Sequence, residues 1–477
     1  MKYKEISRTD KSLRPYQQTA KENIFAGWDE VDNILFQMPT GTGKTRLFTS
    51  IISDIKAWGI INASDAKMLI IAHRVELIEQ ISESLDKYRV AHGIIAGGKE
   101  RNLRPLVQVA SIQTITHHTN EEVAKALDVD FIIIDEAHHS TAKSYRKLLD
   151  LYPSAKKLGV TATPWRMNHL GFTSVFDKLI ISKSIKDFIK EGWLAPYSYY
   201  SIKDSSQIRH DINGINEFDI EGDYKVSALE RVMDRSSIRA NLLDSYLKLA
   251  KGKKGIIYSI SRKHSLHICS EYKQAGINIV CIDSETPRNE RRLYVQRFKS
   301  GLIDIIVNVD IFSEGFDCPD IEFIQLARPT KSLVKYLQQV GRGLRPTVGK
   351  GKCIILDNVG AHIEFDLPDA DRTWETEFEG DVQHRKKRNS NTVRNAPANS
   401  ARSFEEGGDE LSLIEDVEND GCIDRSKNEP IEIWTDSDNE LLRTLYIDRK
   451  CPIEVISSVF RKDVQDVQSQ LSKLNLQ

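Results

Sequence analysis

The residues best suited to chemistry form one run, Met38–Thr45, which reads Met-Pro-Thr-Gly-Thr-Gly-Lys-Thr. Backbone N–H groups of such a loop meet phosphate oxygens, and Gly41 and Gly43 permit the backbone angles that this close approach requires. Lys44 brings a positive charge to the terminal phosphates, and the hydroxyl of Thr45 can ligate Mg²⁺. The usual pattern has glycine where this chain has Met38, but the order of strand, loop, Lys-Thr and helix predicts nucleoside triphosphate binding.

A second group of chemical residues, Asp-Glu-Ala-His, directly follows the apolar run at residues 131–134. A carboxylate at a strand end can hold Mg²⁺ through water, and we assign this role to Asp135. Glu136 can orient and deprotonate the attacking water, and His138 is placed to sense the phosphate. An isolated Asp-Glu pair is usually solvated surface, but here it follows a buried strand downstream of Gly-Lys-Thr and therefore indicates hydrolysis.

Two arginines stand near the end of an amphipathic run in the second half of the chain, in the stretch Gln338–Arg345 (QQVGRGLR). Arg342 and Arg345 are three residues apart and project to one side if the turn is helical. Two guanidinium groups aimed across a cleft would stabilise charge on a leaving phosphate. A plain surface pair of arginines is the alternative if no phosphate site lies opposite.

A glutamine precedes the first predicted strand, in the stretch Leu13–Gln17 (LRPYQ). The side chain of Gln17 can donate and accept the pair of hydrogen bonds that adenine offers at N6 and N7. Alone the pentapeptide says little, but its place ahead of the phosphate loop suggests that adenine is selected.

Two α/β sheets must position these residues. Short, continuous apolar runs of the kind found in buried parallel strands lie at residues 34–36, 68–72, 107–110, 131–134 and 158–161, and again at 255–258, 277–282, 303–307, 323–326 and 353–356. Functional residues follow the first set, as expected for an open sheet whose ligands gather at the carboxyl ends of its strands. Only the first half has a Gly-Lys-Thr loop, which suggests a site completed across a cleft.

The pattern divides the chain into five segments: a first lobe at 1–195, a crossing segment at 196–235, a second lobe at 236–368, a flexible linker at 369–430 and a small all-helical domain at 431–477. The basic run at 384–391 is either a solvated linker or an arm that contacts phosphates. The three short helices predicted at the end resemble a helix-turn-helix or Myb-like module, which would contact DNA, or form a domain that binds a protein partner.

Composition limits the number of domains and the kinds of site and partner that we expect. The chain has 477 residues, enough for two or three domains, and its net charge of −2 leaves any nucleic-acid binding to local basic patches. None of the six cysteines forms a C-x-x-C pair, so we expect neither a zinc ribbon nor a disulfide framework. The absence of a leading apolar segment and of a long apolar run predicts a cytoplasmic protein with no membrane contact, in a bacterial or phage-infected cell.

Over residues 10 to 360 the order and wording of the motifs resemble a superfamily 2 DEAD/DEAH-box helicase with two RecA-like lobes, most like the RadD, UvsW and Irc3 DNA helicases of the XPB type. Besides the motifs above, the matching stretches are residues 72–77 (AHRVEL), 111–114 (SIQT), 161–164 (TATP) and 308–319 (NVDIFSEGFDCP). RadD-like proteins have cysteine-rich modules beyond the motor, and this chain has the helical module there instead.

The resemblance implies ATP and Mg²⁺ as cofactors and a role for each matched residue. The nucleotide would be held by Arg14, Gln17, Thr40, Gly41, Thr42, Gly43, Lys44, Thr45 and Arg46, with Gly315 and Asp317 joining from the second lobe. Thr45 and Asp135 would hold the metal, and catalysis would use Lys44, Asp135, Glu136, Gln338, Arg342 and Arg345. His138, Thr161 and Thr163 would couple the nucleotide to a nucleic-acid track at Arg74, Gln113, Thr114, Ser259 and Asn308.

The expected activity is ATP-driven unwinding or remodelling of duplex, forked or branched DNA. An RNA helicase has the same nucleotide motifs, because preference for the 2′-OH leaves no mark in them. The motor subunit of a restriction or phage-defence complex is a further alternative. A nucleotide-driven binding switch without translocation is the rival of another class, and an intact Glu136 with paired arginines argues against it.

Overall fold

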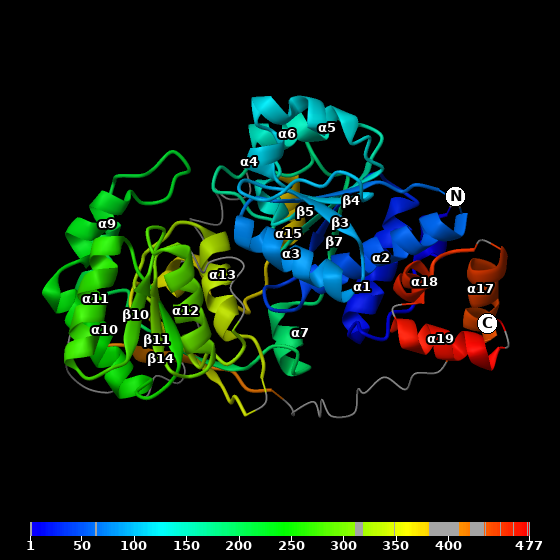
Figure 1. Cartoon of the computed structure of the whole chain (residues 1–477). Helices are drawn as coiled ribbons and strands as arrows, with labels where there is room; N and C mark the ends of the chain where they lie inside the picture. The colour runs from blue at the N-terminus through cyan, green and yellow to red at the C-terminus, as the bar shows by residue number, and fades with distance from the viewer. Residues whose placement is uncertain are drawn as a thin grey trace.

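Two seven-stranded α/β sheets in tandem form two lobes, and a small helical domain packs beside the first (Figure 1). The structure is a computed structural model that describes residues 2–62, 64–310, 318–347, 349–380, 410–419, 434, 436–448, 450–460, 462–474 and 476. Within these residues no helix is both long and apolar enough to cross a membrane.

Lobe 1 is built on a parallel sheet with the strand order β3-β4-β2-β5-β6-β1-β7. The central strand β5 reads Phe-Ile-Ile-Ile-Asp and is buried along its length, because both faces of such a sheet are covered. The elements of this lobe are η1 Tyr3–Ile6, α1 Pro15–Trp28, β1 Asn33–Gln37, α2 Lys44–Asn62, β2 Met68–Ala72, α3 Val75–Lys87, β3 His92–Ile95, β4 Val107–Ser111, α4 Ile112–Ile115, η2 His118–Asn120, α5 Glu121–Ala126, β5 Phe131–Asp135, η3 Ala137–His139, α6 Lys143–Leu149, β6 Lys156–Thr161, β7 Lys178–Ile181 and α7 Ile185–Lys190.

Lobe 2 repeats the plan with the strand order β10-β11-β9-β12-β13-β8-β14, in which only β14 runs antiparallel to its neighbour. Its elements are β8 Tyr197–Ser201, α8 Gln207–Asn213, α9 Val226–Met233, α10 Ser236–Leu249, β9 Gly255–Tyr258, α11 Arg262–Gln274, β10 Ile279–Ile282, α12 Arg288–Lys299, β11 Ile305–Asn308, β12 Phe323–Leu326, α13 Leu333–Gly343, β13 Cys353–Asp357, α14 Ala361–Phe365 and β14 Ser412–Asp416. The two parallel α/β sheets expected from the sequence are confirmed.

The expected crossing segment at 196–235 is wrong as a separate unit. Its strand β8 pairs with β13, so lobe 2 begins near Tyr197. Alternate residues of β8 are buried, namely Tyr197, Tyr199 and Ser201. A tyrosine-serine alternation lacks the continuous apolar run by which the other strands were recognised.

The stretch 369–430 is not wholly a linker. Helix α15 (Trp374–Glu379) returns to lobe 1, where Phe378 is buried in a cluster with Phe172 and its carbonyl accepts the N–H of Phe172 at 2.7 Å. Strand β14 extends the sheet of lobe 2. These short elements are ordered by the lobes they touch and not by their own pattern. The basic run at 384–391 lies outside the described residues.

The helical domain docks on lobe 1. It comprises α17 Asp436–Arg443, the π-helical turn η5 Thr444–Asp448, α18 Ile453–Phe460 and α19 Val464–Lys473. Its core is formed by Leu442, Leu445, Ile456, Val459, Val467 and Leu471, and it includes Ala57 of α2 from the lobe. The domain therefore shares a hydrophobic core with the helix that begins at the phosphate loop.

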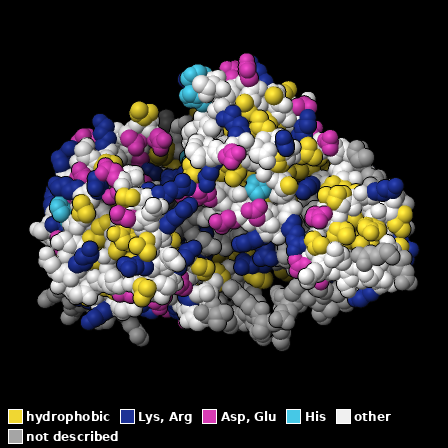
Figure 2. All heavy atoms as spheres, viewed as in Figure 1, with side chains coloured by type: hydrophobic (Ala, Val, Ile, Leu, Met, Phe, Trp, Pro, Cys, Tyr) yellow, Lys and Arg dark blue, Asp and Glu magenta, His cyan; other side chains and the backbone are white. Residues whose placement is uncertain are grey.

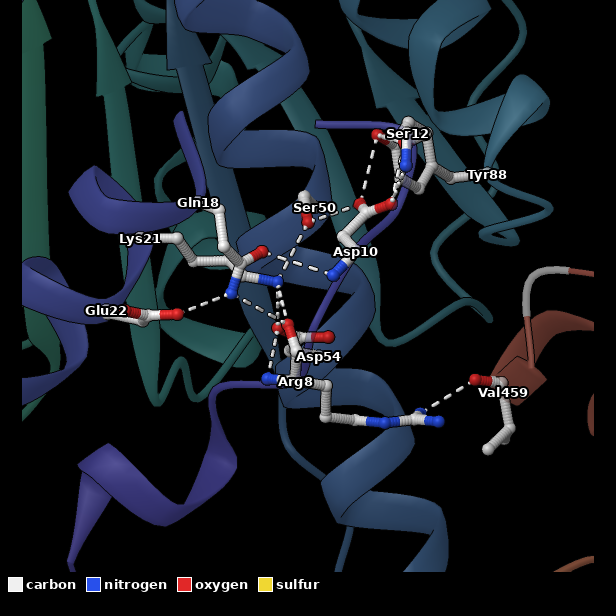
Figure 3. A network of polar contacts seen from close by, with 10 residues as sticks. All are labelled: Arg8, Asp10, Ser12, Gln18, Lys21, Glu22, Ser50, Asp54, Tyr88 and Val459. Carbon is white, nitrogen blue, oxygen red and sulfur yellow. Dashed lines mark hydrogen bonds and ion pairs between the residues drawn. The ribbon is translucent and has the colours of Figure 1, made fainter. Parts of the chain in front are cut away.

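A buried polar network fixes this contact (Figure 3). The guanidinium of Arg8 donates to the carbonyl of Val459 in α18 at 2.7 Å, and the backbone N–H of Arg8 donates to Asp54 at 3.0 Å. Asp54 on α2 pairs with Lys21 on α1 at 2.7 Å, with both side chains fully buried. A charge buried this deeply requires its partner, so the pair sets how α1 lies on α2.

One disulfide departs from the expectation drawn from cysteine spacing. Cys269 on α11 and Cys281 on β10 are bonded, with their Cα atoms 6.5 Å apart. Helix α11 crosses directly to β10, and this packing brings together two cysteines that belong to no recognisable motif.

Candidate nucleotide site between the lobes

The phosphate loop connects β1 to α2 at the carboxyl edge of the first sheet. Gly41 and Gly43 both have positive φ, +88° and +91°, which favours glycine at both positions. The Nζ of Lys44 donates to the carbonyl of Met38 at 3.3 Å, while the side chain of Met38 is fully buried in the core. Methionine therefore replaces the usual glycine because only its backbone faces the site.

The predicted adenine residues brace this loop from α1. The amide of Gln17 donates to the carbonyls of Thr42 (3.0 Å) and Gly43 (3.1 Å) and accepts the N–H of Arg14. The hydroxyl of Tyr16 donates to Thr42 as well, at 2.8 Å. Arg14 lies over the ring of Trp193, 5.2 Å from its centroid. Sequence reasoning missed Tyr16 and Trp193, although Tyr16 stands inside the same pentapeptide.

The acidic residues at the end of β5 are linked to the Thr-Ala-Thr-Pro segment after β6. Glu136 has φ +50° and ψ +53°, an uncommon conformation for a non-glycine residue that turns the chain sharply after Asp135. The Nδ1 of His138 lies 3.3 Å from Glu136 and 3.2 Å from the hydroxyl of Thr161. Thr161 in turn accepts the N–H of Thr163 at 3.2 Å. The three coupling residues thus form one continuous polar connection.

Lobe 2 closes the site with α13. A Cβ added to Gly341 would lie 2.7 Å from the Cβ of Thr40, and one added to Gly41 would lie 3.2 Å from the Cγ of Arg345. Gln338 and Arg342 are buried at the same junction. Burial lowers the pKa of Lys44, the carboxylates of Glu136 and Asp135 oppose this shift, and Arg342 and Arg345 add to it. The arginines of one lobe therefore act on the lysine of the other.

The site residues fit Mg²⁺ as well as a nucleotide. The carboxylate of Asp135 is buried. Thr45, the second residue of α2, is partly buried. Their oxygens are the hard donors that Mg²⁺ prefers. Thr42 is fully buried and its hydroxyl donates to Pro39 at 2.7 Å, so its side chain holds the loop together; Arg46 is exposed. Gly315 and Asp317 lie outside the described residues.

Charged residues also join the lobes away from the nucleotide site. Glu76 on α3 pairs with Arg291 on α12 at 3.1 Å, and Glu79 pairs with Arg288. Figure 2 shows basic and acidic side chains side by side along this boundary. Arg74 donates to the carbonyl of Asp310 at 2.8 Å. The lobes therefore also contact each other away from the nucleotide site.

The predicted track is only partly at the surface. Gln113 in α4 is exposed and donates to the carbonyl of His73 at 2.9 Å, with Thr114 beside it. Ser259 and Asn308 are buried, and the hydroxyl of Ser259 donates to the carbonyl of Asn308 at 3.2 Å. Both side chains are buried in this conformation, so their assignment to direct nucleic-acid contact stays a prediction.

Comparison with known proteins agrees with this geometry. Residues 10–166 match the family described as type III restriction enzyme, res subunit, and residues 238–347 match the helicase conserved C-terminal domain. A solved fragment named as the HsdR subunit of a type I restriction enzyme from Vibrio vulnificus is 22% identical with a TM-score of 0.57, over 79% of this chain and 68% of that one. At this identity the likeness shows the fold alone.

Three relatives give the family. The chain is 34% identical to a 51.5 kDa protein of a Lactococcus phage, over 77% of this chain and 74% of that protein. It is 31% identical to the protein named as ATP-dependent helicase IRC3 in Saccharomyces cerevisiae, over 73% of this chain but only 52% of the yeast protein, so it spans about half that length. It is 25% identical to the DNA 3'-5' translocase XPB2 of Sulfurisphaera tokodaii, over 70% of this chain and 78% of that protein. Together with the closed two-lobe site, these matches show that the chain belongs to superfamily 2 of the ATP-dependent helicases, in the group that includes Irc3 and XPB2.

Proposed function

We propose that this protein uses ATP hydrolysis to move along DNA and to unwind or remodel duplex, forked or branched DNA. The observation that supports this best is the position of Arg342 and Arg345 against the phosphate loop, because it makes hydrolysis depend on lobe closure. When two lobes both contact one DNA strand, their opening and closing moves one lobe along that strand. We propose DNA and not RNA as the substrate because the XPB2 relative is named a DNA translocase.

Each residue of the site has a separate proposed role in ATP hydrolysis. Lys44 and the loop N–H groups hold the phosphates, and Glu136 accepts a proton from the attacking water. Arg342 and Arg345 stabilise charge on the leaving phosphate. Thr45 and Asp135 would hold Mg²⁺, which would supply charge neutralisation at the phosphates when bound.

Phosphate release from ATP tests the proposal. It is measured with the protein alone and then with single-stranded DNA, duplex, forked DNA and RNA. Strong stimulation by DNA, greatest with forked forms, is expected. Equal or greater stimulation by RNA would move the protein to the RNA helicases, and indifference to every nucleic acid would favour the binding switch.

Two variants serve as controls for the chemistry. Lys44→Ala should abolish turnover because the phosphates lose their cation. Glu136→Gln should lower turnover by roughly 100-fold or more while ATP still binds, because only the base is removed. Normal hydrolysis by Glu136→Gln would exclude that residue as the base.

A motor subunit of a restriction or phage-defence assembly is the second candidate. The match of residues 10–166 to a restriction-enzyme family favours it. Such a motor would translocate on duplex DNA without a free end and without releasing single strands. Displacement of a labelled third strand from a closed circular duplex, with no unwinding of forks, would favour this candidate over the first.

The helical domain is proposed as the part that binds a partner, either DNA or a protein. Helix α19 presents polar residues to solvent, among them Gln465, Gln468 and Lys473. Replacing Lys473 in the full chain and measuring DNA affinity against salt separates the two partners. A shallower slope of log affinity on log salt indicates phosphate contact, and an unchanged slope favours a protein.

A further inference from the structure

The loop before α9 carries a carboxylate, Asp223, that is 1% exposed and lies against the start of α13. Its oxygens accept the hydroxyl of Thr330 (2.9 Å), the N–H of Lys331 (2.8 Å), the Nζ of Lys335 (2.9 Å) and the N–H of Tyr224 (2.9 Å). Burial alone would raise the pKa of Asp223, but the charge of Lys335 and these hydrogen bonds outweigh burial and lower the pKa. Asp223 is therefore ionised, and both of its oxygens are occupied.

Three of these donors lie in the turn that joins β12 to α13 and in the first turn of the helix. The hydroxyl of Thr330 also accepts the N–H of Ser332 at 3.0 Å. Ser332 in turn caps α13, because its hydroxyl accepts the N–H of Lys335 at 3.3 Å. A negative charge near the N-terminus of a helix is also favoured by the helix dipole. Asp223 therefore holds the first turn of α13 in place through an ion pair and a continuous set of hydrogen bonds.

The other end of α13 meets lobe 1, and Figure 1 shows the helix on the side of lobe 2 that faces that lobe. Arg342 follows Lys335 by seven residues, about two helical turns, so the two side chains lie on nearly the same face of the helix. The charge of Arg342 acts on Lys44 of the phosphate loop. The residue that Asp223 binds and the arginine that reaches the nucleotide site thus belong to one short helix.

A small movement at the start of this helix would be large enough to affect chemistry. A helix side chain ends about 6 Å from the helix axis, so a rotation of α13 by about 10° would move the guanidinium of Arg342 by about 1 Å. A catalytic group misplaced by about 1 Å can slow a reaction by about 100-fold. The position of the first turn of α13 is therefore important for the placement of Arg342.

We propose that Asp223 is a positioning residue for ATP hydrolysis, which orients α13 so that Arg342 meets the phosphates in the closed site. This inference rests on the role of Arg342 in the proposed function. The four groups that donate to the carboxylate all belong to lobe 2, so Asp223 acts through the helix and not on the nucleotide. The phosphate loop belongs to lobe 1, and its hold on ATP does not depend on Asp223.

The test compares full-length Asp223→Asn with the wild type in steady-state ATP hydrolysis. Asparagine has the same size but one carbonyl oxygen in place of two, so it cannot accept all four hydrogen bonds and leaves Lys335 without its counter-charge. The kcat should fall about tenfold or more, because Arg342 is misplaced, while the KM for ATP should change less than about twofold. A normal kcat in this variant would overturn the inference.

Asp234→Asn is the matched control in the same lobe. The side chain of Asp234 is 4% exposed and pairs with Arg239 on α10 at 2.7 Å and with His267 on α11 at 2.9 Å. Neither of these helices carries a residue of the candidate nucleotide site. This variant should lower the unfolding temperature but keep kcat, expressed per ATP-binding site, within about twofold of the wild type. Equal losses of kcat in the two variants would assign the effect to the packing of lobe 2 and overturn the positioning role.

A double variant separates positioning from folding. Arg342→Ala removes the group that Asp223 is proposed to position, and its slow hydrolysis can be measured in single turnovers with enzyme in excess. In this background Asp223→Asn should slow hydrolysis less than about twofold. A further tenfold loss would overturn the positioning role. Normal turnover in Arg342→Ala alone would instead remove the role of the arginine in the proposed function, and the inference with it.

Discussion

Replacing Gly341 with alanine should slow ATP hydrolysis without harming the fold. Gly341 is the point at which α13 meets the phosphate loop, and an added Cβ would lie 2.7 Å from the Cβ of Thr40 and 3.0 Å from its Cγ2. Carbon atoms in favourable contact are about 3.5–4.0 Å apart. The closed lobes would therefore have to separate by about 1 Å at this point.

The size of the decrease in turnover can be estimated because only the closed arrangement of the lobes contains the overlap. Overpacking a tight contact costs about 1–3 kcal/mol, and here the cost applies only to the closed arrangement. With 1.36 kcal/mol for each tenfold change in rate, turnover should fall roughly 5- to 150-fold. Alanine is also favoured over glycine inside a helix by about 1 kcal/mol, so lobe 2 by itself should become slightly more stable. Activity and stability are expected to move in opposite directions.

Steady-state phosphate release and thermal unfolding measure the two quantities. Gly343→Ala is the matched control in the same helix, because its Cβ would lie 2.4 Å from the sulfur of Cys353 and 2.8 Å from Ile324, both inside lobe 2. This variant should lower the unfolding temperature. The two glycines thus report separately on the contact between lobes and on the core of one lobe.

Wild-type turnover in Gly341→Ala would refute the reasoning, since it would mean that hydrolysis does not need this contact between α13 and the loop. A double variant with Thr40→Gly removes the atoms that the new Cβ meets. Turnover in the double variant equal to that of Thr40→Gly alone would show that the overlap itself is responsible, and a further loss relative to Thr40→Gly would assign the defect to α13.

Three further outcomes are expected. Glu79→Gln removes an interlobe pair with Arg288, and because the groups are partly exposed it should weaken closure by about 0.2–1 kcal/mol, seen as a raised KM for ATP that disappears at high salt. Burial lowers the pKa of His264 to about 4. Because His264 binds a proton below about pH 6.5 in the unfolded chain but only near pH 4 in the folded one, the free energy of unfolding should fall by about 3 kcal/mol between pH 6.5 and 4. His264→Phe should remove that part of the pH dependence of thermal unfolding. Joint replacement of Arg8 and Arg89 by alanine should speed amide hydrogen exchange in α18 and leave basal ATP hydrolysis unchanged, because both side chains donate to the helical domain.

Much of the fold was predictable because buried parallel strands are continuous apolar runs. The strand at 131–134 and its neighbours stand out for this reason. The strands that were missed lie toward the edges of their sheets: β3, β7, β8 and β14. β7 is nowhere fully buried, and β8 alternates. A strand covered on one side needs fewer apolar residues, so its pattern merges with that of the surrounding loops.

The residues of the candidate nucleotide site could be placed equally well where they are consecutive. Gly43, Lys44 and Thr45 lie at a strand-to-helix turn, and Asp135 and Glu136 end a strand, so local sequence alone places them. Their chemistry follows from their types: an ammonium, a hydroxyl and two carboxylates. The sequence by itself therefore determined the donors and the edge of the sheet on which they stand.

Only the tertiary structure decided which of these groups meet. The contact of Gly341 with Thr40, the burial of Ser259 and Asn308, and the docking of the helical domain on α2 all join residues far apart in the chain. Such contacts depend on which face of each helix packs against the other lobe. That choice is set by the fit of many side chains at once, and no short stretch of sequence contains it.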